Sequence, residues 1–131
     1  MPLIVASCAN LGPNPYVQPQ AVSGPCSIEP FFIVAFRETP TNMAVKNTGQ
    51  MCAISMFNPD LGAVQDAAFL SLRPAHGQAW TQIFGGDRGM VIVFYKPTPA
   101  YFGPDLFDIT FEPGARDVLF HVVVSSPTAQ P

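Results

Sequence analysis

Proline and glycine interrupt this sequence so often that no long helix fits into it. The chain has 15 prolines and 10 glycines among 131 residues. Between them, no segment shows the apolar period of a helix of several turns. Short apolar runs separated by turn residues are typical of β-strands. The sequence therefore predicts an all-β protein, and its length is that of a single domain.

Strand patterns recur along the chain with turn residues between them. The clearest lies at residues 107–111, where Phe107, Ile109 and Phe111 alternate with polar residues, so that one face of the strand is apolar. About seven such segments, with turns every 8 to 12 residues or so, predict a two-sheet antiparallel sandwich. The other predicted strands cover residues 31–36, 52–56, 67–72, 80–83, 90–95 and 118–124.

Two of these strands carry further expectations. Residues 31–36 form a near-continuous apolar run, which predicts a strand that is buried on both faces or covered by a partner. In the strand at residues 67–72, we expect Phe69 and Leu72 to contribute to the core.

The first 25 residues have a different composition and predict an extended arm. An apolar start is followed, over residues 10–24, by a stretch rich in Pro, Gln, Asn and Gly. Prolines lack the N–H that a central strand needs, so this stretch is read as an arm or linker. The predicted organisation is an arm at residues 1–25, a sandwich at residues 26–125 and a polar tail at residues 126–131.

The three cysteines have different surroundings. Cys26 and Cys52 lie in or beside predicted strands, and they either form a disulfide in an oxidising compartment or stay buried as thiols. Cys8 follows Val-Ala-Ser, which resembles the small-residue motif before a lipidated cysteine in bacterial lipoproteins. No positively charged residue precedes that motif here, so lipidation of Cys8 is an alternative and not the main expectation.

Charge is scarce in this chain. Charged residues make up 11% of it and the net charge is −3, whereas about 25% is usual in soluble domains. With eleven phenylalanines, this favours a surface partly covered by protein partners, in a homo- or hetero-oligomer; a small secreted domain with Ser, Thr, Gln and Pro on its surface is the alternative. The cations do not cluster, which argues against nucleic acid, and no apolar run is long enough to span a membrane.

The second half of the chain resembles the bacterial immunoglobulin-like and cadherin-like modules. The resemblance covers about residues 66–124 and depends on a Pro-Ala-His-Gly turn at 74–77, a strand ending in Tyr-Lys-Pro at 95–97, and a Gly-Pro-Asp-Leu-Phe stretch at 103–107. It implies an immunoglobulin-like sandwich with an extracytoplasmic, adhesive or assembly role. The motif residues are His76, Gly77, Tyr95, Pro97, Gly103, Asp105 and Phe107.

Each motif position has a structural explanation. Gly77 and Gly103 suit positions that need a positive φ or a close backbone approach. Tyr95 and Phe107 are expected to be core or corner aromatics, and Asp105 to cap a loop by accepting hydrogen bonds from nearby amides. The acidic calcium-binding motifs found between the repeats of such modules are missing.

The sequence shows no known catalytic motif, and we expect no enzyme activity. His76 falls in a predicted turn and His121 on the polar side of a strand. Gly-Gly-Asp at residues 85–87 is read as a turn, because no lysine and no helix follow it. A zinc site built from Cys26, Cys52 and one histidine has no supporting spacing.

Calcium is the one cofactor that the sequence leaves open. Asp105, Asp108 and Glu112 are candidate ligands, but Asp108 and Glu112 lie roughly 13 Å apart at about 3.3 Å per residue of a strand. Asp60 and Asp66 flank a loop and are the other carboxylates free to bind an ion.

Two pairs of adjacent aromatic residues are candidates for protein contacts. In a strand, alternation sends one member of Phe31/Phe32 and one of Tyr101/Phe102 away from the core, and outward aromatics favour protein–protein interfaces. For Tyr101 and Phe102, a loop that folds them back onto the edge of the sandwich is equally compatible with the following Gly103.

Together these features predict a non-catalytic structural or accessory subunit of a bacterial envelope or cell-surface assembly, in the periplasm or outside the cell. One alternative is a phage virion protein, for capsid decoration or in the tail. The other is a small carbohydrate- or ligand-binding module, in which Trp80 with Tyr95 or Tyr101 would stack on a sugar.

Overall fold

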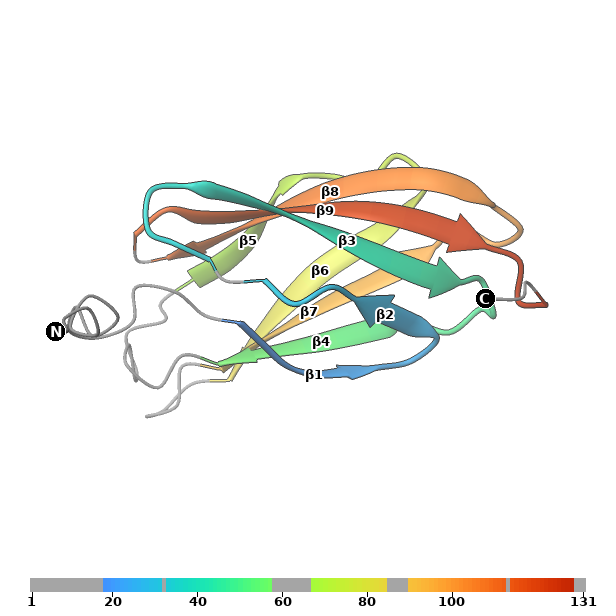
Figure 1. The fold of residues 1–131 in the computed structure, drawn as a ribbon, viewed down its shortest axis with the longest axis horizontal. Coiled ribbons are helices and arrows are strands. Elements are labelled where there is room, and N and C mark those ends of the chain that lie inside the picture. The colour runs from blue at the N-terminus through green and yellow to red at the C-terminus, as the bar shows by residue number, and fades with distance from the viewer. Residues whose placement is uncertain (1–17, 32, 58–66, 85–89, 113, 129–131) are drawn as a thin grey trace, which may run out of the picture.

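The computed structural model describes residues 18–31, 33–57, 67–84, 90–112 and 114–128. Within them the chain forms nine strands and no helix (Figure 1), so no helix of the described part could cross a membrane. The strands are β1 (Gln18–Ser23), β2 (Cys26–Ile28), β3 (Glu38–Lys46), β4 (Cys52–Phe57), β5 (Ala67–Leu72), β6 (Gly77–Phe84), β7 (Met90–Pro97), β8 (Gly103–Glu112) and β9 (Arg116–Ser125).

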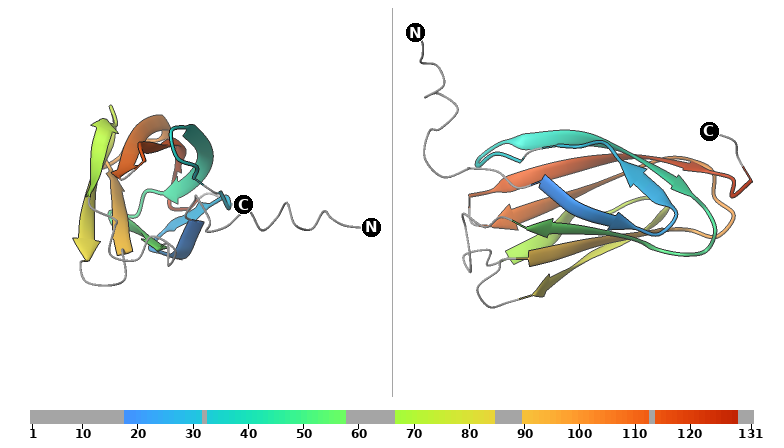
Figure 2. Two further views of the ribbon diagram at one scale, coloured as in Figure 1. Left: turned by 90° about the vertical axis from the view of Figure 1, so that its left-hand side faces the viewer. Right: turned by 60° about the horizontal axis from the view of Figure 1, so that its bottom comes forward.

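The strands form two sheets that stack face to face (Figures 1 and 2). The four-stranded sheet has the order β1-β4-β7-β6, and the five-stranded sheet has the order β2-β3-β9-β8-β5. The all-β, two-sheet architecture predicted from the sequence is confirmed. The expectation of only antiparallel pairs is wrong, because β3 and β9 are parallel along their whole shared length.

The core lies between the sheets, and in β7 and β9 it is built by alternation. In β9, every second residue from Arg116 to Val124 is buried, and β7 shows the same pattern from Val91 to Pro97. Each large aliphatic or aromatic side chain removed from water in this way contributes about 2 kcal/mol. The largest buried side chains include Tyr95, Phe107, Phe111, Phe120, Ile33, Ile54, Met56 and Ile109.

Residues 31–36 do not form the predicted strand. Phe31 and Ile33 are buried, but the segment is irregular and Phe36 is 81% exposed. Phe36 has a φ of 61°, outside the range of a β-strand, and its N–H donates to the carbonyl of Gly114 at 2.6 Å. Regular pairing begins only at Glu38. Of the described residues of this apolar run, Phe31 and Ile33 therefore pack into the core without forming a strand.

The strand predicted at residues 67–72 has the observed bounds of β5, but the residues assigned to its core side were wrong. Phe69 is 47% exposed and Leu72 44% exposed, whereas Ala68 is buried and Leu70 packs against the core. Phe69 alternates with Ala68 and Leu70 and so faces outward, and the register shift between Leu70 and Leu72 places Leu72, opposite Asp108, on the same outer face.

Part of the predicted arm belongs to the sandwich. Residues 18–23 form β1, an edge strand paired with β4. The ladder shifts register between Pro19 and Ala21, which is how an edge strand accommodates a residue that lacks an N–H. The arm therefore does not extend to residue 25. Residues 1–17, including Cys8, lie outside the described residues.

A disulfide joins the two sheets. Cys26 in β2 is bonded to Cys52 in β4, with their Cα atoms 6.0 Å apart. Cys52 is fully buried in the core. Both thiols are consumed by this bond, which excludes them as zinc ligands while it is intact.

Loss of this disulfide should lower the stability of the protein. For a sequence separation of 26 residues, the loss of loop-closure entropy in the unfolded chain corresponds to about 3.5 kcal/mol. We expect the double variant Cys26→Ala/Cys52→Ala to unfold at a clearly lower urea concentration, and the reductant-treated wild type to do the same. Ser27→Ala, at an exposed position of β2 beside Cys26, is the control and should unfold like the wild type. Equal midpoints for the double variant and the wild type would contradict this assignment.

Candidate functional site

The motif residues of the second half gather around one buried carboxylate. Asp105, at the start of β8, is 8% exposed. Its Oδ2 accepts a hydrogen bond from the Tyr95 hydroxyl at 2.7 Å, and its Oδ1 accepts from the backbone N–H groups of Ala75 and His76 at 3.0 and 3.3 Å. The carboxylate thus ties the turn between β5 and β6 to β7 and β8, which belong to different sheets.

Tyr95 is held as a neutral donor. Burial raises the pKa of Tyr95 far above its usual value, and the hydrogen bond to Asp105 and the negative charge of that carboxylate raise it further. The ring is fully buried and stacks on Phe107, with centroids 5.3 Å apart. A phenol in this position has no access to a ligand, so its role is structural.

A chain of aromatic contacts continues from Tyr95 through the core. Phe107 stacks on Phe120 with centroids 4.5 Å apart, and Phe120 meets Phe31 edge-to-face at 6.1 Å. Phe31 is only 5% exposed. Phe31 fills the core and is therefore the inward member of its predicted pair. Phe32 lies outside the described residues.

The same end of the sandwich contains two glycines in constrained positions. A Cβ on Gly77 would lie 2.7 Å from the carbonyl oxygen of Lys96. Gly103 has a φ of +139°, and a Cβ there would lie 2.8 Å from the Tyr101 hydroxyl. Close approach and a positive φ were the two reasons expected for glycine here; a close approach applies at both positions and a positive φ at Gly103.

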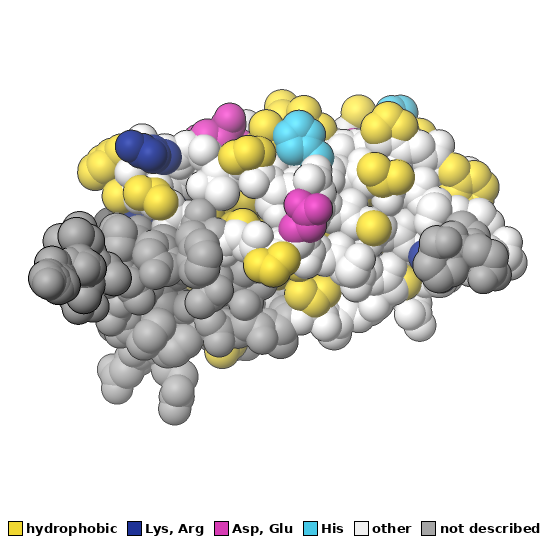
Figure 3. Space-filling view, in the orientation of Figure 1, with side chains coloured by type: hydrophobic (Ala, Val, Ile, Leu, Met, Phe, Trp, Pro, Cys, Tyr) yellow, Lys and Arg dark blue, Asp and Glu magenta, His cyan; other side chains and the backbone are white. Residues whose placement is uncertain are grey.

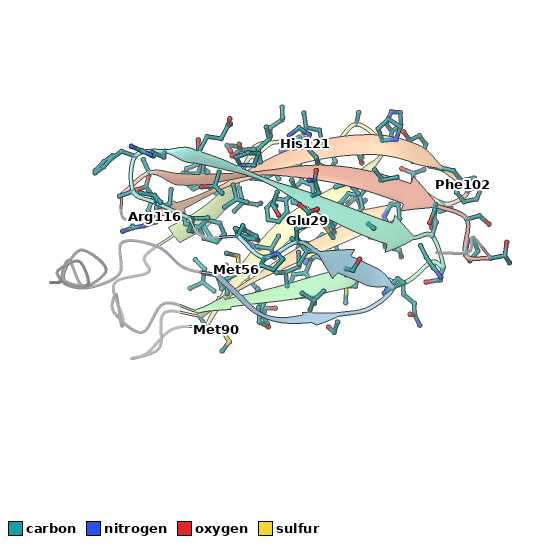
Figure 4. All side chains as sticks on the ribbon, viewed as in Figure 1. Glu29, Met56, Met90, Phe102, Arg116 and His121 are labelled. Carbon is teal, nitrogen blue, oxygen red and sulfur yellow. A yellow bond between two sulfur atoms is a disulfide. The ribbon has the colours of Figure 1, made fainter. Side chains whose placement is uncertain are left out.

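Tyr101 folds back onto the sandwich, whereas Phe102 does not. The Tyr101 ring stacks on His76 with centroids 4.1 Å apart, and its hydroxyl donates to the carbonyl of Pro104. The side-chain amide of Asn47 donates to the carbonyl of Tyr101 at 3.0 Å. Phe102 is 52% exposed and lies at this end of the molecule (Figure 4). Of the four predicted contact aromatics, Phe102 is thus the most exposed in the described residues.

Three carboxylates meet on the outer face of the five-stranded sheet. Oxygen atoms of Glu38, Asp108 and Asp117, from β3, β8 and β9, all lie within 4.8 Å of one another. Asp108 is 5% exposed and its Oδ1 accepts a hydrogen bond from Ser71 at 2.5 Å. Thr110 donates to Asp117 at 2.6 Å.

Burial raises the pKa of Asp108 to about 6, and the neighbouring carboxylates Asp117 and Glu38 add to this, against the opposing hydrogen bond from Ser71. The candidate calcium ligands named from the sequence are not brought together as a set. Asp108 meets residues of two other strands, while Asp105 is engaged with Tyr95. Asp60 and Asp66 lie outside the described residues, as does the turn at residues 85–87.

The pKa of Asp108 makes the stability of the fold depend on pH. The folded state holds a proton up to about pH 6, whereas the unfolded chain releases it near pH 4. Stability should therefore decrease as the pH rises from about 4 through about 6. We expect urea midpoints measured across this range to decrease in the wild type and to decrease much less in Asp108→Asn. Glu112→Gln, which removes a carboxylate elsewhere in β8, is the control and should keep the decrease. The same pH profile for Asp108→Asn and the wild type would contradict the assignment.

Apolar side chains remain exposed on the outer face of the five-stranded sheet. Phe69, Leu72 and Val123 are 47%, 44% and 60% exposed. An open hollow of about 460 Å³ on this face is lined in part by His76 and His121, the two histidines of the chain. Figure 3 shows hydrophobic side chains around both histidines, and Figure 4 shows His121 on the outer side of the sheet.

The outer face of the four-stranded sheet carries an aromatic pair. Trp80 in β6 lies opposite Phe94 in β7, and the two rings stack with centroids 5.2 Å apart. Trp80 is 38% exposed. Neither predicted partner of Trp80 lies beside it, because Tyr95 points into the core and Tyr101 is stacked on His76. The outward position of Phe94 could have been predicted from the unbroken apolar run at residues 90–94, since such runs have apolar side chains on both faces.

Comparisons with protein-family models, with curated proteins and with solved structures gave no match to this chain. The function is therefore argued from the surfaces and contacts described above.

Proposed function

We propose that this protein is a non-catalytic structural or accessory subunit that acts through protein–protein contacts of an immunoglobulin-like domain. The observation that carries the proposal is the exposure of apolar side chains on the outer faces of both sheets, around a core that is already filled. Phe69, Leu72 and Val123 on one face and Trp80 on the other are 38% to 60% exposed. Apolar surface of this kind is typical of interaction sites.

The strand order supports an immunoglobulin-like domain. In immunoglobulin domains, the first, second, fifth and fourth strands form one sheet, and the third, sixth and seventh form the other. The order β1-β4-β7-β6, together with the neighbours β9-β8-β5, follows that arrangement if β2 and β3 are taken as additional strands after the first. The disulfide between β2 and β4 differs from the inter-sheet disulfide of antibody domains, which joins the second and sixth strands.

The disulfide also supports an extracytoplasmic location. Disulfides persist in the periplasm, at cell and virion surfaces and in secreted proteins, and are rare in the reducing cytosol. The bond between Cys26 and Cys52 therefore fits an envelope or cell-surface assembly, and it fits the surface of a virion as well.

The engagement of titratable side chains in packing supports a role without catalysis. The carboxylate of Asp105 accepts hydrogen bonds from Tyr95 and from backbone amides, and the ring of His76 is stacked on Tyr101. Each of these groups has a structural role that accounts for its position.

The proposal is tested at the exposed face of the five-stranded sheet. We expect that chemical cross-linking in the native source captures a partner protein with the wild type, and that Phe69→Lys/Val123→Lys loses at least most of that product while its circular dichroism is unchanged. Gln50→Lys, at an exposed position between β3 and β4, is the control and should behave like the wild type. A wild type that yields no specific product, or a double variant that yields the same one, would count against the proposal.

A carbohydrate-binding module is the second candidate, because Trp80 and Phe94 form an exposed stacked pair. Trp80 is the only tryptophan of the chain, so its fluorescence reports on this face directly. If this candidate is correct, titration with soluble oligosaccharides such as cellohexaose or chitohexaose shifts the emission, and Trp80→Ala abolishes binding measured by calorimetry without unfolding the protein. If neither sugar changes the emission, the stacked pair no longer supports this candidate.

A further inference from the structure

The four edge strands of the two sheets differ in how well they are protected against pairing with another chain. Natural edge strands are usually short, bulged, charged or interrupted by proline. β1 contains Pro19 and a register shift, β2 has only three residues, and β5 has a register shift between Leu70 and Leu72. Three edges therefore carry a protective feature.

β6 carries none of these features. It runs for eight residues, Gly77–Phe84, with the sequence Gly-Gln-Ala-Trp-Thr-Gln-Ile-Phe, which contains no charged residue and no proline. It pairs with β7 at every position without a register shift. Within the described residues, β7 is its only neighbour in the sheet. This leaves a long row of backbone groups on its other side, in a strand without a bulge or a charged residue.

The space beside β6 is open. A hollow of about 340 Å³ lies along its first half, lined by Leu70 of β5, by Arg73 and Pro74 of the turn that follows, and by Gly77, Gln78, Ala79 and Trp80 of β6. Farther along the strand, Ile83 is 39% exposed. The edge strand β5 of the other sheet contacts β6 through the Thr81 hydroxyl, which donates to the carbonyl of Ala68 at 2.6 Å. In the described residues β5 and β6 are not paired in a sheet, so the backbone edge of β6 is left for a further strand.

The sequence of β6 is complementary to itself when two copies run antiparallel. With Trp80 opposite Trp80 of the second copy, Gln78 faces Gln82 and Ala79 faces Thr81. Residues that lie opposite each other in an antiparallel pair are on the same face, and this register keeps Gln78, Trp80 and Gln82 all on the outer face. No like charges meet, and the aromatic and amide side chains meet their own kind.

We propose that two copies of this chain pair antiparallel along β6, so that their four-stranded sheets join into one continuous sheet across a two-fold axis at Trp80. This inference rests on the proposed function and deepens it by naming one partner, a second copy. A symmetric contact of this kind covers both exposed edges at once and closes on itself.

Charge substitutions at Gln78 and Gln82 test both the contact and its register. Gln78→Lys/Gln82→Lys places lysine opposite lysine twice, and we expect the dimer dissociation constant to rise by roughly tenfold or more. Gln78→Lys/Gln82→Glu places lysine opposite glutamate twice, and we expect dimerisation to return to the wild-type level. Both side chains are exposed in the single chain, so each variant should fold; circular dichroism and thermal melts check this.

The measurement is the molar mass by size-exclusion chromatography with light scattering over a range of concentrations, where the monomer is 14.1 kDa. Ser55→Lys, on the outer face of β4 and away from the edge, is the control and should dimerise like the wild type. A wild type that stays monomeric overturns the inference, and so does a Lys/Glu variant that fails to regain the dimer lost in the Lys/Lys variant.

The design separates this inference from the proposed function. If the dimer persists in both β6 variants but dissociates in Phe69→Lys/Val123→Lys, the proposed pairing through β6 is wrong. This outcome leaves standing the broader proposal that the protein works through its sheet faces.

Discussion

The packing at one end of this sandwich depends on the hydrogen bonds that the carboxylate of Asp105 accepts. A buried carboxylate is costly unless its oxygens are hydrogen-bonded, and here they accept from Tyr95 and from the backbone of the turn at residues 75–76. Because Tyr95 and Asp105 lie on strands of different sheets, their hydrogen bond fixes how the sheets sit on each other. The aromatic contacts that start at Tyr95 then carry that arrangement into the core.

This network and the disulfide stabilise the interior. The side chains of the outer faces are therefore not needed for the core and can be apolar. The chain has few charges to cover them, so tryptophan, phenylalanine and valine side chains remain at the surface on both sheets. The motif residues and the exposed residues thus have separate tasks. The former stabilise the sandwich, and the latter are the surfaces proposed for contacts with a partner and with a second copy.

Much of the fold could be predicted from local alternation, whereas the cluster of carboxylates could not. The alternation of apolar residues is enough to predict β9. Its apolar residues are all buried: Val118, Phe120, Val122 and Val124. The apolar run at residues 31–36 led to a wrong prediction of a strand, because composition cannot separate a buried strand from a buried irregular segment. The meeting of Glu38, Asp108 and Asp117 requires the parallel pairing of β3 with β9, and no pattern within one strand encodes the register between two.

The most direct test of this account asks whether the buried network stabilises the fold. Groups kept for function commonly cost stability, so removing them tends to be neutral or stabilising; a structural hydrogen bond behaves in the opposite way. Tyr95→Phe, which deletes only the buried hydroxyl that Asp105 binds, should lower the free energy of unfolding by about 1 to 3 kcal/mol in urea titrations. Tyr101→Phe deletes an exposed hydroxyl and should cost much less. A Tyr95→Phe protein as stable as the wild type would contradict the account.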